Sequence, residues 1–293
     1  MGGAGKTPMV THLAQRLHAM GHNPAILTRG YKRKSAEPIV LVARGKRATL
    51  DLTGDEAQLF IRSGHAHVGI ASNRYKAGTE VETQLAPDVF LLDDGFQHQK
   101  LARQHDIVLI DALDPFGGGV FPLGRSREPA KALRRATAII LTRADPDHPS
   151  VGLVRRLRRI NPSALILHSR VVPREWVDAE SGAVTKLVQF KPNQIAAFCG
   201  LGNPRAFWAT LDELRLEVCY RWDFGDHHSY KAVELQRYAE NAKAAGAEVL
   251  VTTEKDAVNL PAGVAKMVEP FRLHWLRIGI EIEREEELLR LLL

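Results

Sequence analysis

Short apolar runs that end in acidic residues recur through the first half of the chain. They are DVFLLDD (88–94), DIVLID (106–111) and ATAIILTRAD (136–145). Segments with helical spacing of apolar residues, such as 11–23 and 73–86, lie along the same stretch of sequence. This pattern is typical of parallel strands that are buried on both faces. Ligands of such sheets bind at the carboxyl ends of the strands, where these acids stand.

The chain begins with the glycine-rich stretch GGAGKTP (2–8), and a helical segment follows at once. Glycines let successive N–H groups curl round an anion, and the helix adds the positive end of its dipole. We expect the nucleotide phosphates to be cradled by Gly2, Gly3, Ala4, Gly5 and Pro8. Lys6 would reach the β- and γ-phosphates of ATP, and Thr7 would ligate Mg²⁺. The signature lacks its first glycine and the strand before it, so we expect a sheet without its first strand.

The pattern of apolar and turn residues changes near residue 165 and again near residue 192. Residues 166–192 alternate in polarity around turn residues at 178–182, which predicts a β-hairpin-like connector. The order of strand, glycine loop and helix then restarts with QIAAFCGLGNPRAFW (194–208). We therefore expect an α/β fold with a P-loop NTPase-like, mostly parallel sheet domain over 1–165. The connector would cover 166–192, and a second, smaller α/β domain 193–293.

Several polar groups stand where they could act on a bound nucleotide. Asp93 and Asp94 follow an apolar run, and one of them could organise Mg²⁺ while the other takes a second role or caps a helix. Asp55 and Glu56 (GDE, 54–56) precede a helix-like stretch, which also allows a capping role.

Two loops add further candidates. DFGDHHSY (223–230) could bind a metal or supply a general base oriented by a carboxylate. PLGRSREP (122–129) carries Arg125 and Arg127, whose guanidinium groups suit phosphate oxygens, although solvated arginines are the plainer alternative.

The overall charge favours an anionic partner without choosing one. The chain of 293 residues carries a formal charge of +6, which suits nucleotides, nucleic acid or an anionic membrane surface. No helix-turn-helix or aromatic platform supports nucleic acid. No apolar run reaches the roughly 20 residues that span a bilayer. The two cysteines lack CxxC spacing, which is typical of a reducing compartment rather than of a disulfide framework.

The chain resembles the tetraacyldisaccharide 4′-kinases, because a series of its short motifs occurs in the same order as in that family. The matching stretches are GGAGKTP (2–8), LTRGYK (27–32), GDE (54–56), LLDDGFQHQKL (91–101), DIVLID (106–111), PFGGG (115–119), GRSREP (124–129), FCGLGNP (198–204), FGDHHSY (224–230) and TTEKDAV (252–258). LLDDGFQH together with the later DHHSY and TTEKDAV is the specific part.

The resemblance implies ATP-dependent phosphorylation of the 4′-hydroxyl of a tetraacyldisaccharide 1-phosphate in lipid A biosynthesis. It implies Asp55 with His227 (or His228) and Asp94 as catalytic residues. Thr7, Asp93 and Glu56 would hold Mg²⁺, and the substrate would be lined by Gln97, His98, Arg125 and Arg127.

The resemblance also implies a monomer at the cytoplasmic face of the bacterial inner membrane, bound peripherally, with no nucleic-acid partner. Family members carry a membrane-associating helix and a strand before the phosphate loop, so we expect this chain by itself to be unstable or weakly active. The alternatives are an inactive truncated kinase and a partitioning or positioning ATPase. Such an ATPase would dimerise on ATP without phosphorylating a lipid.

Overall fold

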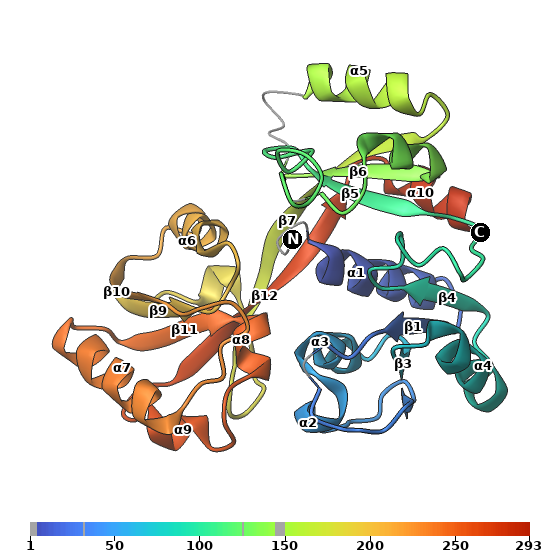
Figure 1. Cartoon of the computed structure of the whole chain (residues 1–293). Helices are drawn as coiled ribbons and strands as arrows, with labels where there is room; N and C mark the ends of the chain where they lie inside the picture. The colour runs from blue at the N-terminus through green and yellow to red at the C-terminus, as the bar shows by residue number, and fades with distance from the viewer. Residues whose placement is uncertain (1–4, 32, 125, 144–149) are drawn as a thin grey trace. The chain divides into compact units, whose positions relative to one another are not determined.

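The computed structural model describes residues 5–31, 33–124, 126–143 and 150–293 (Figure 1). The chain forms two compact units that are interleaved along the sequence. Unit 1 holds residues 1–13, 92–172 and 280–293, and unit 2 holds 14–91 and 173–279. The sequence predicts consecutive domains with boundaries at 165 and 192. The two units are instead assembled from several separate segments each, so they do not test those boundaries, which remain a prediction.

The first part of unit 2 carries a small sheet with helices on it. Its elements are β1 (Pro24–Thr28), β2 (Val40–Val42), α2 (Leu50–Thr53), α3 (Asp55–Ser63), β3 (His67–Ile70), α4 (Arg74–Leu85) and β4 (Val89–Leu92). The strand order is β2-β3-β1-β4, with β3 parallel to β1 and antiparallel to β2. Every residue of β1 and β3 is buried, as continuous apolar runs predict.

The rest of unit 2 is a second α/β layer. Strand β9 (Ile195–Cys199) pairs in parallel with β10 (Val218–Asp223) and with β11 (Val249–Thr253), and β11 pairs in parallel with β12 (Leu273–Ile282). β7 (Leu165–Asp178) pairs antiparallel with β8 (Val184–Lys186). The helical elements are η2 (Leu187–Gln189), α6 (Pro204–Glu213), α7 (Ala232–Ala244), α8 (Glu254–Val258) and α9 (Val264–Met267).

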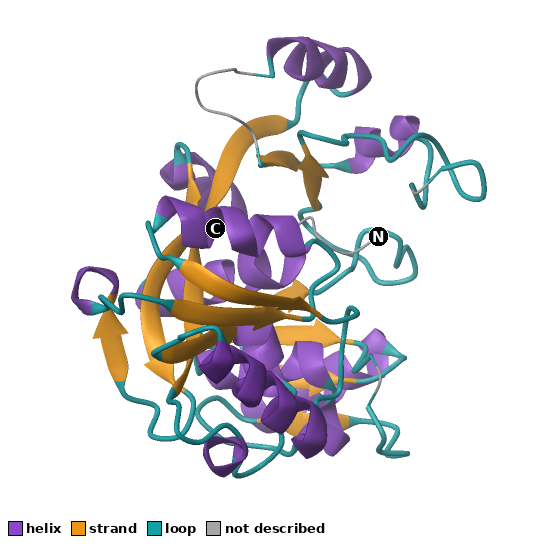
Figure 2. Cartoon of the chain, turned by 90° about the vertical axis from the view of Figure 1, so that its left-hand side faces the viewer, coloured by secondary structure: helices purple, strands orange, loops and turns teal. Residues whose placement is uncertain are grey.

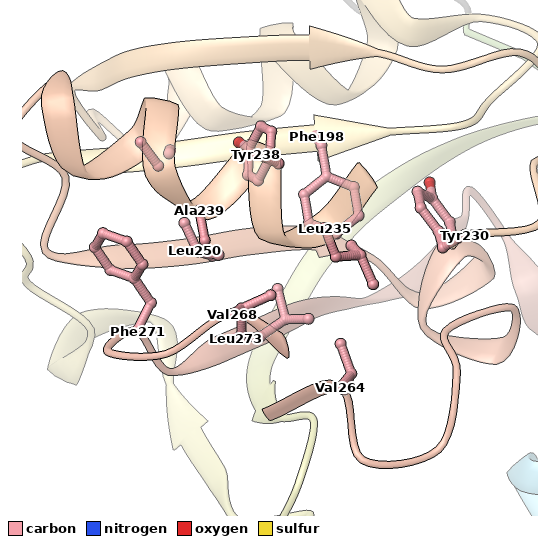
Figure 3. Packing of buried hydrophobic residues seen from close by; sticks show 12 residues of the cluster. Phe198, Tyr230, Leu235, Tyr238, Ala239, Leu250, Val264, Val268, Phe271 and Leu273 are labelled. Atoms are coloured by element: carbon pink, nitrogen blue, oxygen red, sulfur yellow. The ribbon is translucent and has the colours of Figure 1, made fainter. Parts of the chain in front are cut away.

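Alternate residues of β9 pack on opposite faces of this layer, because side chains of a strand alternate. Ala196 and Phe198 join the side chains of α7 and α9, including Leu235 and Tyr238 (Figure 3). Ile195, Ala197 and Cys199 face the other core, which includes Phe207, Trp208 and Leu211 of α6. Both faces are thus covered by helices, as the view coloured by element type also shows (Figure 2).

Unit 1 contains parallel strands and the start of the first helix. β5 (Ile107–Asp111) pairs with β6 (Ala138–Thr142), which pairs with the first residues of β7. The helices are α1 (Lys6–Ala19), which continues into unit 2, η1 (Ala130–Arg135), α5 (Val151–Ile160) and α10 (Glu285–Leu292). Leu141 and Leu157 are fully buried in its core, together with Ile139.

The predicted fold class is confirmed: the chain is α/β with mostly parallel pairing. One detail differs from the expectation. The three acid-ending runs do not share one sheet, because β4 pairs with β1 whereas β5 and β6 pair with each other. Periodicity identifies a strand, but it does not identify the strand's neighbours, which depend on long-range packing.

Candidate active site

The junction of the phosphate loop and α1 is the first part of the site. Gly5 has φ of 75°, in the left-handed region, and its carbonyl accepts a hydrogen bond from the N–H of Met9. Helix α1 then begins at Lys6, which places Lys6, Thr7 and Pro8 in its first turn. The free N–H groups of this turn and the helix dipole favour an anion here. Gly2, Gly3 and Ala4 lie outside the described residues.

Asp94 links this junction to the end of β4. Its Oδ1 accepts a hydrogen bond from Lys6 Nζ at 2.7 Å, and its Oδ2 accepts one from Arg127. Burial alone would raise the pKa of the Asp94 carboxyl, but the hydrogen bonds and charges of Lys6 and Arg127 outweigh burial, and the pKa lies below its ordinary value. Asp94 is therefore an anion held between two cations. Lys6 and Arg127 bring an ammonium and a guanidinium group to this carboxylate, and both groups suit phosphate oxygens.

The remaining candidates of this unit lie around that cluster. Arg127 also reaches Gln97 Oε1 at 3.5 Å. His98 lies in the same turn, where its carbonyl accepts a hydrogen bond from Arg103. Of the two adjacent acids, Asp94 is the one that contacts Lys6. Asp93 is buried, with 5 % of its surface exposed, and it interacts with other groups. Arg125 lies outside the described residues.

Asp55 and His227 meet within unit 2, although 172 positions separate them in sequence. His227 Nδ1 contacts Asp55 Oδ2, and Asp55 Oδ1 accepts the N–H of Glu56 at 2.9 Å. Asp55 is 6 % exposed. It starts α3 directly after Gly54, which has φ of 81° and ψ of 163°. The sequence left a capping role open, and the contact with His227 now gives this carboxylate a specific partner.

The structure also separates the two neighbouring histidines. His228 stacks on Phe224 with ring centroids 4.5 Å apart, and its Nε2 lies 3.1 Å from Glu234. His227 has φ of 57°, which turns the loop so that its ring faces Asp55. Of the two, His227 is therefore the partner of Asp55.

Next to His227 lie Asp226, from the predicted DFGDHHSY loop, and Lys255, for which sequence reasoning assigned no role. Lys255 Nζ donates to Asp226 Oδ1 at 2.6 Å and lies 3.5 Å from His227 Nε2. Asp226 Oδ2 is 3.8 Å from the same nitrogen. Tyr31 completes the surroundings, with its ring edge-on to His227 at 5.5 Å. The TTEKDAV stretch was the available signal for Lys255, but it carried no assigned role.

A buried carboxylate supports the loops that hold these groups. Asp256, which is 2 % exposed, accepts hydrogen bonds from Tyr230 Oη at 2.8 Å, Thr253 Oγ1 at 2.6 Å and Gly200 N at 2.9 Å. Burial raises the pKa of Asp256 although these donors oppose it. The network connects the loop after β9 to the end of the DFGDHHSY loop and to α8, so it orders the surroundings of His227 and Lys255.

The residues predicted to ligate Mg²⁺ come from both units of the chain. Thr7 and Asp93 of unit 1 each carry a side-chain oxygen of the kind that Mg²⁺ prefers. Glu56, in unit 2, carries a carboxylate of the same kind. Within the described ranges, no cluster of three or more His, Cys, Asp or Glu side chains is arranged to hold a metal by itself. Mg²⁺ usually keeps several waters and binds through one or two carboxylates plus substrate phosphates.

Comparison with known proteins adds an independent line of observation. A family model described as tetraacyldisaccharide-1-P 4′-kinase (LpxK) matches residues 1–293. The tetraacyldisaccharide 4′-kinase of Anaeromyxobacter sp. (strain K) is 39 % identical over 99 % of this chain and 77 % of its own length. That of Syntrophobacter fumaroxidans is 36 % identical over 92 % of this chain and 71 % of its own length.

A solved structure is similar as well. The crystal structure described as the "apo" form of LpxK from Aquifex aeolicus in complex with ATP aligns with a TM-score of 0.75 and 28 % identity. The alignment covers 99 % of this chain and 84 % of that one.

Proposed function

This chain belongs to the tetraacyldisaccharide-1-P 4′-kinase family, and from that premise we propose how its residues transfer a phosphoryl group. The reaction moves the γ-phosphoryl group of ATP to the 4′-hydroxyl of a tetraacyldisaccharide 1-phosphate, a step of lipid A biosynthesis. The match of the family model to the whole chain is the observation that carries this function.

Unit 1 supplies the nucleotide side of the reaction in this proposal. The first turn of α1 offers N–H groups to the phosphates, and Lys6 turns from Asp94 to the β- and γ-phosphates of ATP. Arg127 stabilises charge on the transferring group. Thr7 and Asp93, with Glu56 from unit 2, would hold Mg²⁺, which offsets the charge of the phosphates. Gln97, His98 and Arg125 line the acceptor.

Unit 2 supplies the group that accepts the proton of the attacking hydroxyl. Asp55 is a buried carboxylate whose orientation is fixed by His227 and by the N–H of Glu56. His227 acts as a positioning residue, and Lys255 with Asp226 holds the far side of its ring. Such base catalysis contributes roughly 10²–10⁴-fold in rate. The two clusters belong to different units, and their joint action on one ATP and one acceptor is part of the proposal.

We further propose that the enzyme is a monomer that works at the cytoplasmic face of the bacterial inner membrane, bound peripherally. An acceptor with four acyl chains resides in a bilayer, so the kinase has to work at its surface. Among the residues that the structure describes, none of the helices has both the length and the apolar character needed to cross a bilayer.

Transfer of ³²P from γ-labelled ATP to the acylated disaccharide in detergent micelles tests the function. We expect Asp55→Asn to reduce kcat by about 10²–10⁴-fold with little change in the binding of ATP. Lys6→Ala should weaken ATP binding and turnover together. Lys34→Ala is the matched control, because the Lys34 side chain is 78 % exposed and pairs only at the surface with Asp51.

Two results would count against the proposal. If Asp55→Asn weakened ATP binding as much as turnover, Asp55 would not be the base. If the protein hydrolysed ATP and dimerised on it while no labelled lipid formed, the partitioning type of ATPase would replace the kinase.

A further inference from the structure

The loop that follows β5, whose course can be traced in Figure 1, carries several exposed apolar side chains. Phe121 is 68 % exposed and Leu123 94 %, Val120 is 39 % exposed, and Leu113 earlier in the loop is 73 % exposed. Single exposed apolar side chains are common on proteins, but a local group of large ones marks a surface of interaction. We call Val120, Phe121 and Leu123 the apolar tip.

Hydrogen bonds at the base of the loop keep the apolar tip in a defined conformation. The N–H of Phe121 donates to Ser126 O at 3.0 Å, and the N–H of Ser126 donates to Gly119 O at 2.9 Å. A Cβ on Gly124 would overlap the backbone of Gly119, so only glycine at position 124 allows these two segments of the loop to approach so closely. The backbone groups are paired at the base while the apolar side chains remain in solvent.

A strongly basic helix borders the base of this loop. The buried Leu157 holds α5 on the core of unit 1, whereas Arg155 and Arg159, one turn apart, are exposed. The guanidinium of Arg156 lies 4.0 Å from the centroid of the Phe116 ring, and Phe116 O accepts a hydrogen bond from Ser126 Oγ at 2.6 Å. Helix α5 contains no acidic residue, so its positive charge is not offset within the helix.

We infer that the apolar tip and the arginines of α5 together form the surface by which unit 1 binds an anionic phospholipid bilayer. Phe121 and Leu123 enter the acyl region, and Arg155 and Arg159 lie against lipid phosphates. Apolar side chains beside cations are what peripheral membrane segments use, since each contributes where the other cannot. A polyanion such as nucleic acid would engage the arginines but would leave the apolar tip in water.

This inference rests on the proposed action at a membrane, and it names the segment responsible. The experiment measures flotation of the full chain with vesicles of phosphatidylcholine, alone or mixed with phosphatidylglycerol, and no acceptor present. The wild-type chain should float with the anionic vesicles and lose this binding in high salt. The Phe121→Ser/Leu123→Ser variant should bind the anionic vesicles roughly 10- to 100-fold less tightly.

Three further variants separate the two parts of the surface. Arg155→Gln/Arg159→Gln should weaken binding to anionic vesicles roughly 30-fold and leave neutral vesicles unaffected. Val188→Ser is the matched control, because Val188 is 74 % exposed but lies in η2 of unit 2. Phe121→Trp should be quenched by brominated phospholipid, which reports insertion at that position directly.

Each outcome bears on the inference. It is overturned if the wild-type chain floats and the apolar-tip variant floats equally well, or if brominated lipid leaves Phe121→Trp unquenched. If variants of the tip lose activity on acceptor in detergent but keep vesicle binding, the tip contacts the acceptor's own acyl chains instead. If the wild-type chain ignores vesicles yet phosphorylates acceptor in detergent, the membrane inference fails while the kinase function stands.

Discussion

Gly54 directly precedes Asp55, the first residue of α3. Replacing Gly54 with alanine tests whether the backbone geometry at this position places the Asp55 carboxylate. At φ of 81° and ψ of 163°, Gly54 has a conformation that is essentially restricted to glycine. A Cβ at this position would also overlap the carbonyl oxygen of Tyr31, well inside the 3.0 Å that real Cβ atoms keep.

These two effects set the expected size of the change. Holding a residue with a Cβ in such a conformation costs about 1–3 kcal/mol. Overlap with a backbone atom that cannot swing away costs about 1–3 kcal/mol more. We therefore expect Gly54→Ala to lower the free energy of unfolding by about 2–6 kcal/mol, a large part of the about 5–15 kcal/mol typical of a folded domain.

Gly64 at the other end of α3 offers a matched control. It has φ of 69° and ψ of 10°, and a Cβ there would have no heavy atom within 4 Å. Gly64→Ala should therefore cost only the left-handed strain, about 1–2 kcal/mol. Urea unfolding followed by tryptophan fluorescence measures both variants.

Activity provides the second readout of the Gly54 change. Moving the backbone before Asp55 displaces the carboxylate from His227, and a displacement of about 1 Å can cost roughly 10²-fold in rate. Gly54→Ala should thus lose kcat in the folded fraction, whereas Gly64→Ala should retain it. Equal losses of stability in the two variants, or full kcat in folded Gly54→Ala, would refute this account.

Three other properties can be measured on the same protein. The pKa of Asp94 is lowered, so its pairing stabilises the fold above the ordinary carboxyl pKa of about 3.9, and this contribution should disappear as the pH falls through the lower folded value. Asp94→Asn should flatten that acid loss in urea midpoints measured below about pH 5. Asn161, 3 % exposed, donates to two backbone carbonyls and accepts from two N–H groups, so Asn161→Ala should cost about 2–4 kcal/mol in unfolding free energy. Burial, and then nearby carboxylates, raise the pKa of the Cys199 thiol to about 12. At about pH 8 a disulfide reagent should therefore modify Cys199 only when the protein unfolds, and its rate of modification should be lower than that of the less buried Cys219.

Local features of the sequence determined many of the strands and helices, and the start of the first helix after Gly5. Apolar runs such as 138–142 become buried strands wherever they pair, because burial of a continuous apolar run satisfies both faces. The junction of Gly5 with the helix that starts at Lys6 is equally local, since it depends on glycine φ and on the first free N–H groups. The motifs and their order also identified the family, and the match of the family model to residues 1–293 confirms that assignment.

Beyond the pairing of Asp55 with His227 that the family resemblance implied, the tertiary structure decided which distant groups meet. The sequence favoured His227 and kept His228 as an alternative, and the turn at His227 shows that it is the His227 ring that faces Asp55. It also left Lys255 without a role, although this ammonium lies beside His227. Strand order was undetermined for the same reason, as the pairing of β4 with β1 rather than β5 shows. Such contacts depend on packing between segments far apart in the chain, and no local pattern of residues records that packing.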